Sequence, residues 1–463
     1  MKKLLCIALC LALLSGCAAP AAPTTEPRAN EVQITLSDSG IEFPADSGIE
    51  TTKEDIHTVV RITRPGTYRV SGSITAGQLA VDLGEDAAKD PNATVLLILD
   101  NAEIICRTGP AVLFRNVWES GVPNGLAGAH VLLTQGSKNR VVGVSTEEYD
   151  GAFYSRMSMK LDGAGSLRIE CGNEGLCSER HLTIDGGDIS ISSGNDGINA
   201  NADGESVITI NDGRLWIGVA GETGEGDGID SNGSVVINGG HIEAYACADS
   251  MDSGIDADLG IFLNGGTVIA TGNMLDRIED GGQTYAVFSF AQQQKAPYFT
   301  LKDLYGSTVL EAQTPSAFTN LLFSSPDITV GTYTLWSGET QYEGVTSVGG
   351  GGFAQLQPID RPEFPGKGDD GRAEIPPQPT QPIVTHGTPQ PPAEGDRPAD
   401  LPVPPLPPEG AEHMPVPQLP EGAPPPKEAF DRQPVEIITG VLSTEFTVKE
   451  GGNYFTNVRA VEK

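Results

Sequence analysis

The chain has 463 residues and carries 62 acidic against 29 basic side chains, so its formal net charge is −33 at pH 7. This excess of negative charge excludes non-specific attraction to nucleic acid or to an anionic membrane surface as a main function. An acidic polymer of any other kind would also be repelled unless a cation lay between it and the protein.

The N-terminus has the pattern of an export signal. Two lysines precede an apolar run from Leu4 to Leu14, which is too short to span a bilayer as a stable helix. The run ends in Leu-Ser-Gly-Cys, which is similar to the lipobox of bacterial lipoproteins. We therefore expect a signal peptide over residues 1–16, lipidation of Cys17 and a tether over residues 17–30, which would place the protein on the outer face of the bacterial cell membrane. The alternative is an ordinary secretory signal with a chance cysteine.

Four cysteines remain once those up to Cys17 are set aside: Cys106, Cys171, Cys177 and Cys247. They form no CxxC pair, so the sequence gives no support for a zinc or redox site. Export permits disulfides, and Cys171 and Cys177 are the only pair close in sequence, but we expect buried free thiols.

Residues 31–350 consist of short β-rich runs separated by Gly, Asn and Asp, with hardly any helical periodicity. Between about Gly163 and Gly272 these runs form an internal repeat. Its period is given by steps of 26, 27 and 26 residues between equivalent positions, which are Ile184, Ile210, Ile237 and Leu263. The leucine pattern of leucine-rich repeats is missing, and a β-propeller blade would need longer strands. The repeat therefore predicts an all-β parallel β-helix over residues 31–350.

A second motif in each repeat places polar side chains in a row. It reads Asp196-Gly-Ile-Asn199, then Asp227-Gly-Ile-Asp230, then Ser253-Gly-Ile-Asp256. Alternation turns the isoleucines inward and the residue after each one outward. Stacked strands lie about 4.8 Å apart and calcium holds its oxygen ligands at about 2.3–2.6 Å, so an ion could bridge successive turns. The candidate calcium ligands are Asp196, Asn199, Asp227, Asp230, Asp252 and Asp256, centred on the middle turns.

Ordinary corners are the alternative to a calcium site, because Asp-Gly pairs favour turns and asparagine ladders stabilise stacked strands without a metal. We favour calcium since like charges one turn apart cost stability unless a cation binds between them.

Another outward row contains Arg214 and His241, and alternation also turns Trp216 and Tyr245 outward. Aromatic faces can stack on sugar rings, and Arg or His can donate hydrogen bonds to carboxylate or hydroxyl groups. These four residues are therefore candidate ligand-binding residues. The alternative is that Trp216 and Tyr245 pack beneath a loop.

Proline dominates the stretch from Pro358 to Pro434, which holds 23 of the chain's 34 prolines. This composition favours extended chain over a packed core, so we predict a disordered Pro-rich insertion over residues 351–434. Beyond it, β-like sequence returns, and residues 435–463 are predicted to complete or cap the β-helix. A loose tail is the alternative.

Three stretches, in this order, carry a family resemblance: Pro65–Gly72 (PGTYRVSG), Tyr154–Leu167 (YSRMSMKLDGAGSL) and Gly226–Gly233 (GDGIDSNG). They resemble a clostridial family of carbohydrate-binding β-helix lipoproteins over nearly all of residues 32–349. The resemblance implies a right-handed parallel β-helix of the pectate-lyase type, with calcium as the cofactor and cellulose or an acidic plant polysaccharide such as pectin as the partner. We therefore expect a monomeric, non-catalytic polysaccharide-binding protein of the cell surface.

Two other functions remain open. A calcium-dependent polysaccharide lyase would need an Arg or Lys beside the ion to remove a proton, and Arg180 and Arg214 are the nearest candidates. A structural or adhesion protein would use calcium only to rigidify the coil. A hydrolase with paired carboxylates is not supported, because the only Asp-Asp pair, Asp369-Asp370, falls in the Pro-rich segment.

Overall fold

The computed structural model describes residues 30–54, 57–221, 224–347 and 441–461. The predicted signal peptide, the lipidated Cys17, the tether before residue 30 and the Pro-rich segment 351–434 lie outside the described residues. The described part is almost entirely β-structure, with one short 3₁₀ turn at Ala87–Lys89. It contains no helix that is long and apolar enough to cross a membrane.

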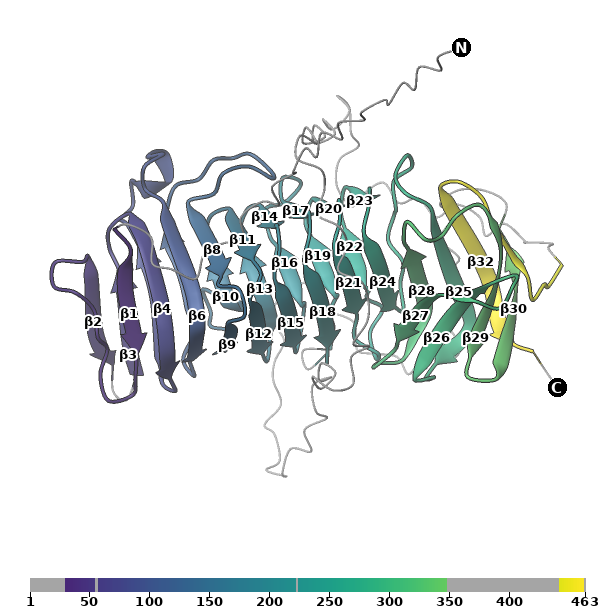
Figure 1. Ribbon diagram of the computed structural model, residues 1–463, viewed down its shortest axis with the longest axis horizontal. Helices are drawn as coiled ribbons and strands as arrows, with labels where there is room; N and C mark the ends of the chain where they lie inside the picture. Colours follow the sequence, from purple (N-terminus) through teal and green to yellow (C-terminus); the bar gives the residue numbers. More distant parts are fainter. Residues whose placement is uncertain (1–29, 55–56, 222–223, 348–440, 462–463) are drawn as a thin grey trace, which may run out of the picture.

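Strands follow one another along the long axis of the molecule (Figure 1). The first part contains β1 (Val32–Leu36), β2 (Ile49–Glu54), β3 (His57–Ile62), β4 (Gly66–Ile74), β5 (Gly77–Asp82), β6 (Val95–Ile105), β7 (Val112–Asn116), β8 (Ala129–Leu133), β9 (Lys138–Gly143), β10 (Gly151–Ser155), β11 (Met159–Gly163) and β12 (Ser166–Cys171). The repeat region contains β13 (Glu174–Ser178), β14 (Leu182–Ile184), β15 (Asp188–Ser193), β16 (Ile198–Ala200), β17 (Val207–Ile210), β18 (Arg214–Val219), β19 (Ile229–Ser231), β20 (Ser234–Ile237), β21 (His241–Tyr245), β22 (Ile255–Ala257), β23 (Gly260–Leu263) and β24 (Thr267–Gly272).

Successive turns of the repeat region contribute strands to three parallel ladders. The ladders are β14–β17–β20–β23, β15–β18–β21–β24 and β16–β19–β22. The residues that define the sequence period stand in register, since Ile184 pairs with Ile210, Ile210 with Ile237 and Ile237 with Leu263. This is a β-helix-like fold, in which stacked turns enclose one continuous core.

Inward-facing apolar side chains fill the centre of the coil. Ile198, Ile229 and Ile255 are almost fully buried in this core, as the alternation of the motif predicts. At one corner an asparagine ladder links successive turns, because Asn238 donates to Asn211 and Asn264 donates to Asn238, each at 2.8 Å. The apolar interior and the polar corner together hold the turns in register.

The parallel coil ends earlier than the sequence predicted. The expectation of a parallel β-helix up to residue 350 is wrong for its last part, because residues 285–346 form antiparallel strands: β25 (Tyr285–Gln294), β26 (Tyr298–Asp303), β27 (Thr308–Gln313), β28 (Phe318–Ser324), β29 (Gly331–Ser337) and β30 (Thr340–Thr346). Two further strands, β31 (Phe446–Val448) and β32 (Gly452–Ala460), join them. We call β25–β32 the C-terminal unit.

The C-terminal unit continues directly from the coil. Its strand β28 pairs antiparallel with β24, the last strand of the parallel ladder, and β32 pairs with β25 and β30 (Figure 1). An aromatic cluster that includes Phe288, Phe290 and Phe455 forms its own core. The described residues of the predicted segment 435–463 are thus strands of this unit, built onto the end of the coil.

Candidate metal and carbohydrate site

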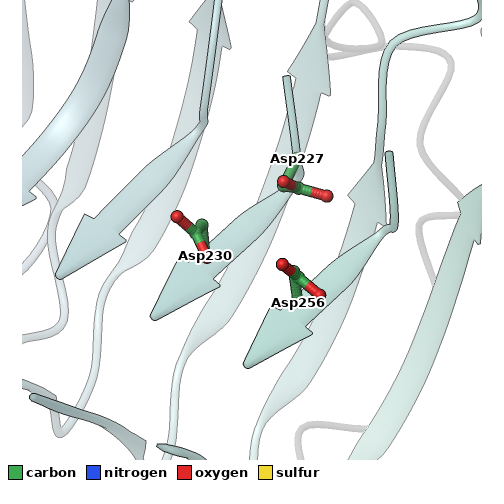
Figure 2. A group of neighbouring side chains, drawn as sticks. All are labelled: Asp227, Asp230 and Asp256. Atoms are coloured by element: carbon green, nitrogen blue, oxygen red, sulfur yellow. The ribbon is translucent and has the colours of Figure 1, made fainter. Parts of the chain in front are cut away.

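Three carboxylates meet on the outer side of the β16–β19–β22 ladder. Asp230 lies on β19, Asp256 on β22, and Asp227 in the corner that precedes β19 (Figure 2). One oxygen of each lies within 4.8 Å of an oxygen of the other two. Asp230 and Asp256 pair directly in the strand register, so the gap between them is set by the spacing of neighbouring strands. This separation suits a cation that contacts each oxygen at about 2.3–2.6 Å.

The corner carboxylates are held in place by the backbone of the next turn. Asp196 accepts a hydrogen bond from the N–H of Asp227 at 2.7 Å, and Asp227 accepts one from the N–H of Ser253 at 2.6 Å. The same contact is therefore repeated from one turn to the next. It fixes the side chain of Asp227 before any ligand binds, which lowers the ordering cost of binding.

Asn199 occupies the ladder position beside Asp230 but makes different contacts. Its amide nitrogen donates to Glu174 at 2.9 Å and to Asp196 at 3.2 Å. Its Oδ1 is buried and has no hydrogen-bond partner among the residues that the structure describes. Buried oxygens of this kind normally have a partner. An orphaned oxygen at the ladder position beside Asp230 fits the all-oxygen ligand set that calcium prefers.

Burial and mutual repulsion raise the pKa values of two of the clustered carboxylates. Burial, with the charges of Asp256 and Asp196, raises the pKa of Asp227 to about 10. Burial, with the charges of Asp276 and Asp230, also raises the pKa of Asp256. These shifts mean that the carboxylates resist ionising together without a cation.

Two carboxylates in the region had not been assigned from the sequence. Asp276 accepts a hydrogen bond from the N–H of Ala257 at 2.9 Å and lies beside Asp256. It follows the last parallel strand, outside the repeat motif, so the period could not reveal it. Glu174 stands at the corner position that Asp196 occupies one turn later, and that alignment was a usable signal. Burial raises the pKa of Glu174 to about 7.

Asp252, another predicted ligand, is held by its own loop and by the preceding turn. Its carboxylate accepts hydrogen bonds from the N–H of Gly226 and from the hydroxyl of Ser250. The structure thus brings together three of the six predicted ligands, Asp227, Asp230 and Asp256, and places Asn199 and Asp196 next to them.

The two aromatic residues predicted to bind a ligand, Trp216 and Tyr245, are not exposed. Trp216 and Tyr245 point out of the coil, as alternation predicts, but their exposed fractions are only 5% and 0%. Their ring centroids lie 6.0 Å apart, and both rings belong to the core of the C-terminal unit. Neither face can therefore stack on a sugar. The alternative interpretation, that Trp216 and Tyr245 are packed and buried, is therefore the better one. The residues that bury them belong to strands of the C-terminal unit and not to a loop.

The polar members of that row lie on a different ladder from the acid cluster. Arg214 and His241 pair in register on β18 and β21. His241 Nε2 lies 2.9 Å from Glu243 Oε1, and the hydroxyl of Tyr245 donates to Glu243 at 2.7 Å. Burial tends to raise the pKa of Glu243, but the contacts with His241 and Tyr245 outweigh it and the net shift is downward. His241 is thus partnered within the fold.

The four cysteines of the described chain, Cys106, Cys171, Cys177 and Cys247, are buried free thiols. Burial raises the pKa of Cys171 to about 11, so this thiol is unreactive at neutral pH.

Comparison with known proteins identifies the family. A family model of carbohydrate-binding domain-containing proteins matches residues 57–295, more than half of the chain. The chain belongs to this family. The acid cluster and the Arg214 row both lie within the matched range, so they are part of the region that makes this chain a carbohydrate-binding domain-containing protein.

Two individual proteins are similar to this carbohydrate-binding chain. One is a carbohydrate-binding domain-containing protein of Acetivibrio thermocellus, 27% identical over 133 residues, which cover 28% of this chain and 44% of that protein. The chain thus matches less than half the length of this relative. The other is a solved structure of a polysaccharide lyase-like protein from C. thermocellum, a gadolinium derivative, with 20% identity and a TM-score of 0.37 over 51% of this chain and 83% of that one.

Proposed function

We propose that this carbohydrate-binding protein holds calcium at Asp227, Asp230 and Asp256 and binds an acidic polysaccharide through that ion. The observation that supports this most is the meeting of three carboxylates within 4.8 Å on one face of the coil. A chain with a net charge of −33 repels a polymer of uronic acids. A bound cation offers a local positive site that overcomes this repulsion.

The ligand count leaves room for the glycan. Calcium takes about 6–8 oxygen ligands. The three carboxylates supply only part of this shell, and the orphaned Oδ1 of Asn199 is a further candidate. Water or a carboxylate of the glycan would take the remaining positions.

We favour binding without catalysis. A lyase needs a basic side chain beside the ion. The two candidates from the sequence are engaged elsewhere, since Arg180 forms an ion pair with Glu205 at 3.2 Å and Arg214 lies on the separate β15–β18–β21 ladder. A purely structural role of calcium is the competing proposal, because the corner carboxylates already link one turn to the next.

The proposal extends to the winding of the coil and its location. We infer a right-handed β-helix, because about 98% of crossover connections between parallel strands have this hand. We also infer a lipoprotein, displayed on the cell surface through Cys17, from the lipobox-like sequence. Mass spectrometry of the protein purified from membranes would detect a diacylated Cys17, and an unmodified residue there would contradict the anchor.

Calorimetric titration of the purified chain with polygalacturonate, in calcium and then in chelator, tests the function. Binding in calcium alone, without formation of unsaturated product, is the expected result. Ultraviolet absorbance of an unsaturated product would favour the lyase. Stabilisation by calcium with no glycan binding would favour the structural role. The matched control is the double variant Glu85→Gln with Glu339→Gln, which removes two exposed carboxylates that lie outside the repeat region.

A further inference from the structure

A groove separate from the acid cluster lies against the β14–β17–β20–β23 ladder. Its volume is about 420 Å³, within the range of about 300–1,000 Å³ that is usual for small-ligand sites. The sheet forms one side, through Val207, Val236 and Phe262. The other side comes from residues 117–128, which connect β7 to β8 and approach the sheet several turns further along the coil.

The floor of the groove is apolar, which is unusual for side chains that point outward from the coil. The outward row on this ladder runs Lys160, Thr183, Thr209, Val236 and Phe262, each paired in register with the next. Its character changes from polar to apolar at the two residues that line the groove. An outward Phe on a solvent-facing strand contributes nothing to the inner core, where its neighbours Ile261 and Leu263 lie. Its apolar face is available to a ligand.

The opposite wall is fixed before any ligand binds. The Glu119 carboxylate accepts hydrogen bonds from the N–H and hydroxyl of Ser158, at 2.6 and 2.8 Å, and from the N–H of Gly121 at 2.7 Å. Asn211, in the corner after β17, donates to Asn124 at 2.8 Å. The contacts with Ser158 and Asn211 tie the connection to the coil at Glu119 and Asn124. A preformed groove of this kind binds a ligand without the entropy cost of ordering a loop.

The rim of the groove offers hydrogen-bonding groups, and its arginine is already engaged in an ion pair. Arg180 forms an ion pair with Glu205 at 3.2 Å, and both line the groove together with His181 and Glu119. His181 accepts a hydrogen bond from the N–H of Val207 at its Nδ1, and burial lowers its pKa, so the ring is neutral at neutral pH. Two carboxylates against one guanidinium disfavour a uronic acid and suit the hydroxyl groups of an uncharged sugar.

We propose that this groove is a second glycan site, which binds a neutral polysaccharide chain without calcium. The apolar face of a sugar ring would pack on Phe262 and Val236, and its hydroxyls would bond to Arg180, Glu205 and Glu119. The proposal rests on membership of the carbohydrate-binding family and goes beyond the calcium site, which lies on another ladder. One molecule would thus hold an acidic and a neutral glycan on different faces.

The test is calorimetric titration of the full chain, in chelator, with neutral linear hexasaccharides of glucose, mannose and xylose. We expect at least one to bind. Phe262→Ala and Arg180→Ala should each weaken its binding about tenfold or more, because each removes a main contact. The matched controls are Tyr305→Ala and Arg459→Ala, an exposed aromatic and a paired arginine of the C-terminal unit.

The controls should bind as tightly as the unmodified chain, and so should Asp230→Asn with Asp256→Asn. Arg180 is half exposed, so its variant remains informative if the Phe262 variant fails to fold. Absence of binding by all three hexasaccharides, or full affinity in the folded groove variants, would overturn the proposal. Either result leaves the calcium-dependent titration with polygalacturonate unaffected, so the two proposals can fail separately.

Discussion

Asn199 and Asp230 occupy equivalent ladder positions, and the difference of one functional group decides where the negative charge collects. The amide of Asn199 donates to Glu174 and Asp196, so it gives those two carboxylates a neutral hydrogen-bond donor. Asp230 and Asp256 cannot donate in this way when they are ionised. The carboxylates that could hold the candidate ion therefore lie in the turns that follow Asn199, and Asn199 itself could add only its Oδ1.

The double variant Asp230→Ala with Asp256→Ala should abolish high-affinity calcium binding. It removes two of the three carboxylates that converge, and the remaining Asp227 cannot hold the ion alone. Titration with calcium by calorimetry measures the stoichiometry. The control is Glu85→Gln with Glu339→Gln, and an undiminished stoichiometry in the alanine variant would show that the ion binds elsewhere.

The stability of the metal-free protein should fall as the pH rises. The folded chain holds the pKa of Asp227 at about 10, against about 3.9 for an unfolded aspartate. Between these values the folded state binds more protons than the unfolded state, so the free energy of unfolding decreases with increasing pH.

Thermal unfolding in chelator from about pH 5 to about pH 9, compared with Asp227→Asn, isolates this contribution. The variant should show a shallower decline of Tm, and saturating calcium should remove the difference in slope. Equal slopes in chelator would contradict the shifted pKa. Calcium at about 100 times its Kd should add about 2.7 kcal/mol to the free energy of unfolding.

Trp216→Ala should destabilise the protein by about 3–5 kcal/mol, as is usual for a large side chain removed from a core. Chemical denaturation measures this loss. Trp336→Ala, at a half-buried position of β29, is the control and should cost less. A Trp216 variant of normal stability that had lost glycan binding would restore the ligand-binding role first expected from the sequence.

At the scale of the element, the corners of the coil limit which residues are allowed. A Cβ added to Gly233, between β19 and β20, would lie 1.9 Å from the backbone oxygen of Ser206 in the preceding turn. Two backbone segments must therefore approach closely there, and only glycine permits it.

Gly233→Ala should consequently lower the Tm by several degrees, because the turns must separate locally and lose their pairing. Differential scanning calorimetry measures the change. Gly331→Ala in β29 is the control, since its added Cβ would meet no atom closer than 3.7 Å. Equal Tm values for the two variants would mean that this corner can adjust at little cost.

The strands of the repeat region could be predicted because the same short motifs recur in successive turns of the sequence. The repeated Gly-Ile-Asn or Gly-Ile-Asp motif and simple alternation were enough to place Asn199, Asp230 and Asp256 in one row, which the strand register reproduces. The C-terminal unit could not be predicted in this way. Its β25 and β32 are neighbours although more than 150 residues separate them, and the burial of Trp216 and Tyr245 depends on that unit.

At the scale of the whole molecule, the described part of the chain is a stack of turns closed by the C-terminal unit (Figure 1). The strand β32 contributes Phe455 and Val458 to the aromatic core, and both are fully buried. The last described strand therefore stabilises residues that lie near the middle of the sequence, including Phe288.

A chain that ends after residue 440 should lose the stability of this unit and expose its aromatic core. Binding of a hydrophobic dye should rise and the Tm should fall, because Phe288 loses its stacked contact with Phe455. The control is a chain shortened only by its last two residues. Unchanged dye binding and Tm in the shorter chain would show that β31 and β32 are dispensable for the core.

The pairing of β24 with β28 also bears on how copies of this protein behave at high concentration. A parallel coil with an open last turn presents unpaired N–H and C=O groups that can template the addition of another chain. Here β28 runs antiparallel to β24, and on the neighbouring ladder the carboxylate of Asp276 takes the N–H of Ala257 at the end of β22. On the third ladder, Ile261 of β23 pairs with Ile278. Each of the three ladders is thus covered at its last turn, so end-to-end growth into fibres is disfavoured at this end of the molecule.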